Sequence, residues 1–175
     1  MPLPTWVPGQ VLAAADVNSY FVPTAVIKPS STSRSSTTTL TADPALTITL
    51  AAGGTYEFRC MLIYNGPSAA GYLGWNWTIP SGGFMGYLAT YAIEGGGGDQ
   101  GYQIGQVAGV ELGAASVNGP AWTSGTSQPW IAYMTGIVGG GTGGAMTLDW
   151  AQFASNGTAT TVQQNSYIAA TRIAT

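Results

Sequence analysis

The chain has 175 residues, of which 6% are charged, 45% are hydrophobic and 26 are glycine, and its formal net charge is −3. Because an ordinary soluble domain carries about 25% charged residues, we expect other protein chains to cover part of this surface. Four basic residues are too few for the basic stripe of a nucleic-acid-binding protein, so we do not expect nucleic acid as a partner. No stretch approaches the ~20 apolar residues of a membrane-spanning helix, so we do not expect a membrane as a partner.

The residue inventory argues against catalysis. Histidine is absent and Cys60 is the only cysteine, so His-dependent triads, His-based zinc sites, thiolate clusters and an intrachain disulfide cannot form within one chain. A pair among the seven acids is the remaining enzymatic alternative, but no spacing requires it. The N-terminus has no basic region followed by an apolar run, so we expect no secretion signal. We predict neither an enzyme nor a cofactor site.

Residues 1–22 form the first predicted unit, an anchor segment. Three prolines among its first eight residues favour extended backbone, and residues 13–21 predict a short helix with one apolar side. A helix of this length is not stable alone, so we expect it to dock onto a partner. The expected docking residues are Trp6, Val11, Leu12, Val17, Tyr20 and Phe21.

Residues 23–175 form the second predicted unit, an all-β, antiparallel, jelly-roll-like β-sandwich. Its first part is a Ser/Thr-rich stretch, for which a linker and an exposed edge strand are both open alternatives. Short alternating runs then predict strands separated by turn signals. The predicted strands are 25–28, 46–50, 56–64, 72–79, 84–91, 102–112, 130–138, 146–153 and 167–173. The predicted turns are 52–54, 80–83, 95–98, 118–119, 139–144 and 156–157.

The strand over residues 56–64 has an unusual pattern on its outer side. Glu57 and Arg59 are polar, but Met61 and Ile63 follow on the same face. A strand that is apolar on both faces at one end is covered at that end. We expect a neighbouring subunit to supply this cover.

Two glycine-rich loops resemble nucleotide or metal sites only in part. Residues 139–144 match G-x-G-x-x-G without a following helix, so we expect a glycine-rich hairpin rather than a dinucleotide site. The loop Gly95–Asp99, together with Glu94, has oxygen ligands suited to a cation such as Ca²⁺. Solvated loop acids are the alternative there.

The tryptophans divide into two groups. Trp75 and Trp77 share one face of a predicted strand, and we expect them in the core or in a contact between subunits. Trp122 lies in a loop rich in small and polar residues, which makes it the candidate for contact with a host-surface glycan.

The N-terminal sequence resembles a short signature of bacteriophage tail and fibre proteins. The matching residues are 5–18, TWVPGQVLAAADVN. Ala13 stands where that signature often has threonine, which removes the usual helix N-cap, and Val17 replaces a common leucine.

The rest of the chain resembles small phage virion proteins with a trimeric jelly roll of the TNF/C1q type. The matching segments are VIKPS (26–30), TSR (32–34), DP (43–44), TYEF (55–58), LDWAQ (148–152) and the closing residues 155–173. This resemblance implies a homotrimer without catalysis or cofactor, made in the bacterial cytoplasm and built into the virion through residues 1–22.

Three functions follow as alternatives. The first is a minor tail or fibre-like structural protein, which contacts other virion proteins. The second is a capsid decoration or head-fibre protein. The third, from a different class, is a lectin-like module that binds host carbohydrate.

Overall fold

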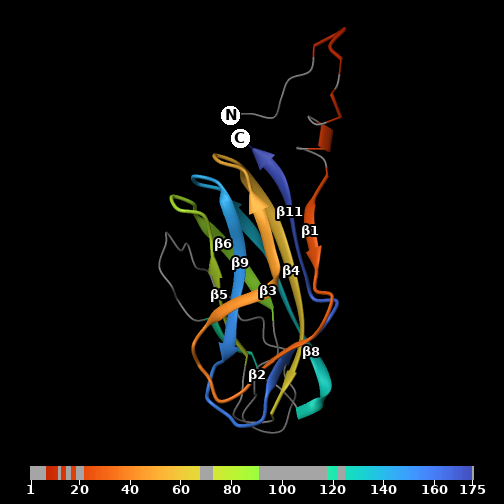
Figure 1. Cartoon of the computed structure of the whole chain (residues 1–175). Coiled ribbons are helices and arrows are strands. Elements are labelled where there is room, and N and C mark those ends of the chain that lie inside the picture. The colour runs from red at the N-terminus through yellow and green to blue at the C-terminus, as the bar shows by residue number, and fades with distance from the viewer. Residues whose placement is uncertain are drawn as a thin grey trace.

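The computed structural model describes residues 7–11, 13–14, 17–18, 22–67, 73–90, 118–121 and 125–174. These residues form two antiparallel β-sheets packed face to face (Figure 1). The predicted all-β sandwich is therefore confirmed. In this part of the chain, no helix has the length and apolar character needed to cross a bilayer.

Eleven strands are present in the described residues. They are β1 (Thr24–Ile27), β2 (Thr32–Arg34), β3 (Thr41–Leu50), β4 (Thr55–Gly66), β5 (Leu73–Thr78), β6 (Met85–Thr90), β7 (Asn118–Ala121), β8 (Gly125–Gly139), β9 (Gly144–Gln152), β10 (Thr160–Val162) and β11 (Tyr167–Ala174).

The strand order is that of a jelly roll. The larger sheet contains the path β1-β11-β4-β8, and the smaller sheet has the order β3-β9-β5-β7. Counted along the chain without β2, β6 and β10, these strands have the orders 1-8-3-6 and 2-7-4-5. Such interleaving of two Greek keys defines an eight-stranded jelly roll. The three remaining strands extend the larger sheet, with β6 on β8 and β10-β2 on the far half of β4.

Alternating side chains fill the space between the sheets. Leu46, Ile48 and Leu50 of β3 are buried, whereas the threonines between them are exposed, as the alternation predicts. Cys60 is also buried. Trp75 and Trp77 lie in the core, which decides between the two expectations for them.

Three loops close one end of the sandwich by packing backbone against backbone. They are residues 51–54, 80–84 and 139–144. Gly53 N donates to Gly141 O at 2.9 Å, and Gly140 N donates to Gly54 O at 2.7 Å. A Cβ on Gly140 would lie 2.3 Å from Ala51 O, so only glycine permits this approach.

One predicted turn is wrong, and another is a turn but not a hairpin. Residues 139–144 were expected to form a hairpin, but they carry the chain from β8 in the larger sheet to β9 in the smaller one. Asn118 and Gly119 were expected in a turn, but they lie in β7. At 118–119 the local turn signal is overridden by the pairing of β7 with β5, a strand distant in sequence.

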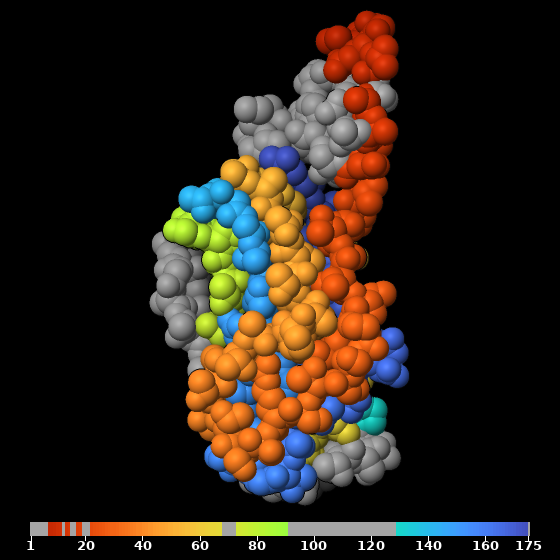
Figure 2. Space-filling view, in the orientation of Figure 1, coloured from red at the N-terminus to blue at the C-terminus, as the bar shows by residue number. Residues whose placement is uncertain are grey.

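The Ser/Thr-rich stretch contains a short edge strand. β2 pairs with β10, which favours the strand alternative for these three residues. This stretch lies at the end of the sandwich opposite the N-terminal segment (Figure 2). The predicted strand 102–112 lies outside the described residues.

Candidate interaction surface

The outward side of the larger sheet carries a continuous row of apolar and aromatic side chains. Residues directly opposite each other in neighbouring strands lie on the same face. Ile27 pairs with Tyr167, Tyr167 with Met61, and Met61 with Tyr133. This row therefore crosses β1, β11, β4 and β8 without an interruption by charge.

Further apolar side chains extend this row on both sides. Ile63 pairs with Ile131, and Leu88 and Ile137 lie on the same side of the sheet. Ile131 is 54% exposed and Ile137 is 45% exposed. We call this surface the apolar face, made of Ile27, Met61, Ile63, Leu88, Ile131, Tyr133, Ile137 and Tyr167.

The outward side of the smaller sheet has a different character. Thr47 and Thr147 form a hydrogen bond between their hydroxyls at 3.0 Å, and Thr78 donates to Asp149 at 2.5 Å. These side chains are polar and satisfy one another. Among the described residues the two outer surfaces of the sandwich thus differ, and the apolar face is the one with the composition of a protein contact.

One ion pair interrupts the apolar face. Arg59 Nη2 lies 3.0 Å from Glu57 Oε1, and the side chains are 59% and 45% exposed, respectively. They stand on β4 between β8 and β11. Among the described residues no other charged side chain lies on this face, and Glu57 is level with Ile137 at one end of it.

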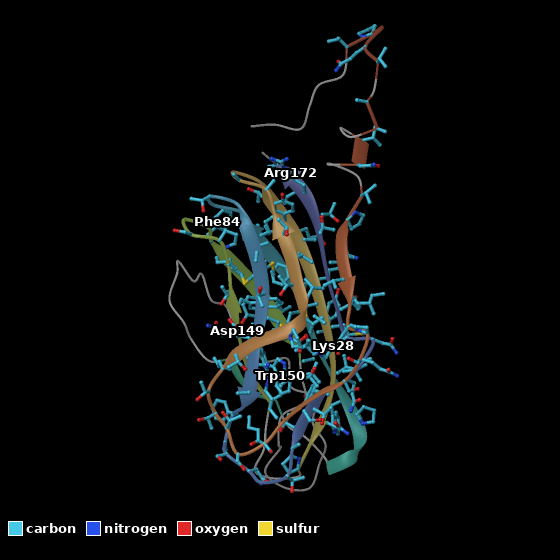
Figure 3. The ribbon with its side chains drawn as sticks, viewed as in Figure 1. Lys28, Phe84, Asp149, Trp150 and Arg172 are labelled. Carbon is cyan, nitrogen blue, oxygen red and sulfur yellow. The ribbon has the colours of Figure 1, made fainter. Side chains whose placement is uncertain are left out.

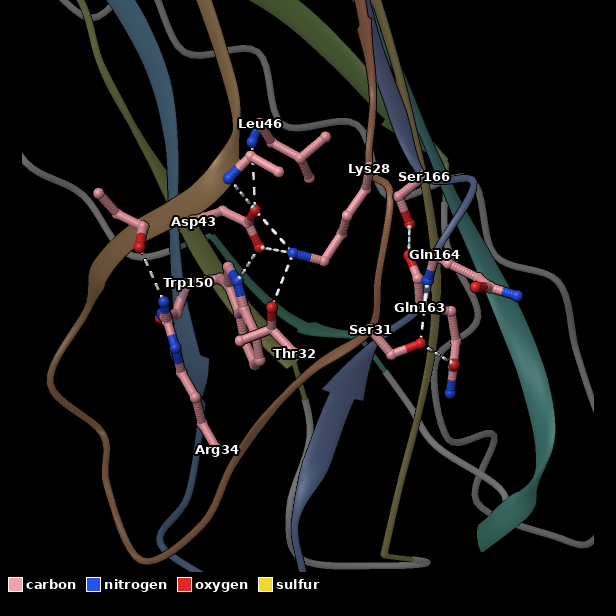
Figure 4. Close-up of polar contacts among 12 residues, drawn as sticks. Lys28, Ser31, Thr32, Arg34, Asp43, Leu46, Trp150, Gln163, Gln164 and Ser166 are labelled. Atoms are coloured by element: carbon pink, nitrogen blue, oxygen red, sulfur yellow. Dashed lines mark hydrogen bonds and ion pairs between the residues drawn. The ribbon is translucent and has the colours of Figure 1, made fainter.

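A second polar cluster is buried where the chain passes from β1 to β3 (Figure 4). Lys28 Nζ lies 2.8 Å from both carboxylate oxygens of Asp43 and donates to Thr32 Oγ1 at 2.8 Å. The Lys28 and Asp43 side chains are both fully buried. Backbone N–H groups of Ala45 and Leu46 donate to Asp43 Oδ1.

Trp150 and Arg34 complete this cluster. Trp150 Nε1 donates to Asp43 Oδ2 at 2.9 Å. The guanidinium of Arg34 lies 4.1 Å from the centre of the Trp150 ring and donates to the carbonyl oxygens of Trp150, Thr41 and Ala42. The cluster joins the end of β1, β2, β3 and β9, and thereby both sheets. Figure 3 shows Lys28 and Trp150 well below the end that carries Phe84 and Arg172.

The carboxylate at the centre of this cluster is held in its charged form. Burial by itself raises the pKa of Asp43, but hydrogen bonds from Lys28, the Ala45 backbone and Trp150 outweigh that effect, so the pKa lies below its ordinary value. All partners of the carboxylate belong to the chain itself. The cluster therefore has the character of a structural lock.

The described residues bring together no group of three His, Cys, Asp or Glu side chains that could hold a metal ion. The thiol of Cys60 is buried, and burial raises its pKa, which suppresses the reactive thiolate. The loop Gly95–Asp99 and Trp122 lie outside the described residues, so the cation and glycan expectations stay predictions.

Two of the predicted docking residues are described. Val11 is 88% exposed and Val17 is partly buried. Val17 N donates to Ala13 O at 3.2 Å, which is the i→i−4 bond of a helical turn. The other four, Trp6, Leu12, Tyr20 and Phe21, lie outside the described part of the chain.

The sequence pattern identifies two of the eight residues of the apolar face. Met61 and Ile63 were singled out by their pattern, but Ile131, Tyr133 and Ile137 were not. The signal was present, because these three alternate with buried residues along β8. What was missing was the pairing of β8 with β4, which places the two apolar runs side by side.

No protein-family model matches the sequence, and no curated protein matches it significantly. Among solved structures, the chain has a weak similarity to infectious bursal disease virus, Gt strain (14% identity, TM-score 0.20) and Gx strain (18% identity, TM-score 0.21). These matches cover 98% and 99% of this chain, which spans less than half of the viral chains, 45% and 42%. At such TM-scores the likeness carries no argument about function.

Proposed function

We propose that this chain is a non-enzymatic structural component of a bacteriophage virion. In this proposal it is a minor tail or fibre-like protein that forms a homotrimer. The N-terminal segment docks it onto other virion proteins. A capsid decoration or head-fibre protein is the alternative within the same class, and the same surfaces serve both.

The apolar face is the observation that carries the proposal. Five of its side chains, Ile27, Leu88, Ile131, Tyr133 and Ile137, are exposed in the single chain. Monomeric soluble proteins rarely expose a large continuous apolar patch. Copies of the chain that pack against one another through this face remove it from water, and this is the main source of free energy for association.

The buried cluster supports the resemblance to phage virion proteins. That resemblance depended on short segments scattered along the chain, including those around Lys28, Arg34, Asp43 and Trp150. In the folded chain these four residues contact one another. A shared structural lock explains why such separated segments occur together.

The N-terminal segment supports the docking role. Residues 7–11 extend beyond the end of the sandwich (Figures 1 and 2), and Val11 is almost fully exposed. A projecting apolar side chain gains stabilisation only when a partner covers it. The segment emerges at one end, so the sandwich of a docked copy points away from the particle.

The test is the state of association of the full chain and of face variants. Ile131→Lys places a charge on the apolar face, where we expect it to convert the trimer into a monomer. Thr49→Lys, a matched change at an exposed position of β3 in the smaller sheet, keeps the trimer. Equal trimer formation by both variants would contradict the proposal.

A second experiment tests docking. A chain without residues 1–22 is expected to form the trimer but not to join the particle. Incorporation of the shortened chain at the level of the full chain contradicts the anchor role. Imaging of a labelled particle then distinguishes a tail position from a head position.

A further inference from the structure

The charged pair on the apolar face uses only part of its hydrogen-bonding capacity. Arg59 donates from Nε at 3.3 Å and from Nη2 at 3.0 Å, and both bonds end at Glu57 Oε1. Among the described residues, neither Glu57 Oε2 nor Arg59 Nη1 has a hydrogen bond. A guanidinium and a carboxylate normally satisfy each other through two parallel bonds, so one acceptor and one donor remain for another molecule.

The surroundings of the pair define what that molecule is. Thr135 and Ile137 lie beside it on β8, and Ala169 and Thr171 lie beside it on β11. A small ligand finds no other charge here, whereas a protein surface that covers the apolar face must also receive this pair. Burying this pair without partners for its remaining donor and acceptor is unfavourable. A second copy of the chain carries the same two opposite charges and can supply both partners.

In the proposed trimer the copies point in the same direction. Glu57 and Arg59 are two residues apart on one face of β4, about 6.6 Å along the strand, and the Arg59 side chain bridges this distance. When an axis parallel to the strands relates the copies, equivalent residues of all copies lie at the same height along that axis. A guanidinium that reaches the carboxylate of its own chain is then level with the carboxylate of the neighbouring chain.

We propose that Arg59 and Glu57 fix the orientation of the copies, with Arg59 of each copy bound both to its own Glu57 and to Glu57 of the next copy. The pairs form a closed ring of alternating charge inside the apolar contact. This inference rests on the proposed function, because it names the residues that orient the self-association. In this arrangement the apolar side chains supply the affinity between copies, and the ring fixes the position of each copy relative to the next.

Four variants of the full chain test the ring, with the dissociation constant of the assembly measured by sedimentation and mass photometry. Arg59→Gln leaves the carboxylates without partners, and we expect association to weaken by at least about 30-fold. Thr49→Glu changes the net charge equally on the smaller sheet and leaves the constant within about threefold. The exchange Glu57→Arg with Arg59→Glu keeps an alternating ring and restores the wild-type constant.

The fourth variant separates register from affinity. Replacing both residues with Met keeps the face apolar, so the chains still associate, but we expect native mass spectra to show several oligomers instead of one. Melting curves of each variant show that the sandwich remains folded. A wild-type trimer with an unchanged constant for Arg59→Gln, or a single oligomer for the double Met variant, overturns the ring alone. A wild-type monomer overturns the proposed function itself.

Discussion

Lys28 and Asp43 form an ion pair in which neither side chain reaches solvent, with Nζ 2.8 Å from each carboxylate oxygen. Lys28 follows β1 and Asp43 lies in β3, so the pair connects the edge strands of the two sheets. Removing one partner of such a buried pair is unfavourable, because the charge left behind has no water to solvate it.

We expect Lys28→Met to lower the free energy of unfolding by about 3–5 kcal/mol, because it leaves the Asp43 carboxylate buried without its cation. Urea unfolding followed by tryptophan fluorescence measures this loss. Thr49→Ser, at an exposed position of β3, serves as the control and stays within about 0.5 kcal/mol of the wild type. A loss below about 1 kcal/mol for Lys28→Met contradicts the structural lock.

Replacing two buried tryptophans with phenylalanine is expected to lower stability by different amounts. Trp150 donates to Asp43, so Trp150→Phe loses a hydrogen bond to a charged group, worth about 1.5–3 kcal/mol, and weakens the contact with Arg34. The indole nitrogen of Trp77 is buried and has no partner in the described structure. Trp77→Phe therefore loses no hydrogen bond, and calorimetry is expected to show the smaller decrease in Tm for this variant. Equal decreases do not fit the cluster described above.

The stability of the sandwich is expected to fall in acid through Asp43. The pKa of this group is lowered in the folded chain, whereas in the unfolded chain it is about 3.9. Its contribution is thus complete above the unfolded pKa and is lost as the pH falls through the lower folded pKa. Unfolding free energies measured from pH 7 to pH 2 show this slope in the wild type, and Asp43→Asn removes it. An identical slope in the variant assigns the acid sensitivity to other groups.

Glycine is expected to be essential at Gly140, in the three loops that close one end of the sandwich, and dispensable at Gly157, outside them. A Cβ at Gly140 meets the Ala51 carbonyl oxygen at 2.3 Å, whereas a Cβ at Gly157 meets nothing within 4 Å. Gly140→Ala forces the loops apart and lowers Tm. Gly157→Ala is neutral or stabilises by up to about 1 kcal/mol, because it restricts the unfolded chain. Thermal unfolding of the two variants side by side tests this difference, which vanishes if the three loops do not pack as described.

Cys60 reports on the integrity of the core. It is fully buried, so a thiol reagent is expected to modify it only after unfolding. The rate of labelling in increasing urea then follows the unfolding transition. Rapid labelling of the native protein contradicts the burial of β4 between its neighbours.

The sequence predicts most of the strands because their alternation is a local signal. The alternation of Leu46, Ile48 and Leu50 with threonine identifies β3 and its buried side without any knowledge of the partner strand. The same reasoning identifies Met61 and Ile63 as an anomaly. The fold class and the expectation of a covered surface follow from these residues.

The rest depends on contacts between distant residues. A glycine run marks the loop after β8, but nothing local states that the next strand joins the other sheet. Lys28 and Asp43 are each ordinary in their own segments, and their pairing follows only when β1 and β3 come together. The extent of the apolar face likewise requires the register between β4 and β8.

The mass of the full chain in solution tests the central claim most directly. If copies of the chain cover the apolar face, sedimentation or light scattering at micromolar concentration gives three times the chain mass of 17.9 kDa, and Ile131→Lys reduces it to one chain. A folded wild-type monomer that stays soluble at this concentration, with Ile131 and Ile137 open to water, contradicts the account.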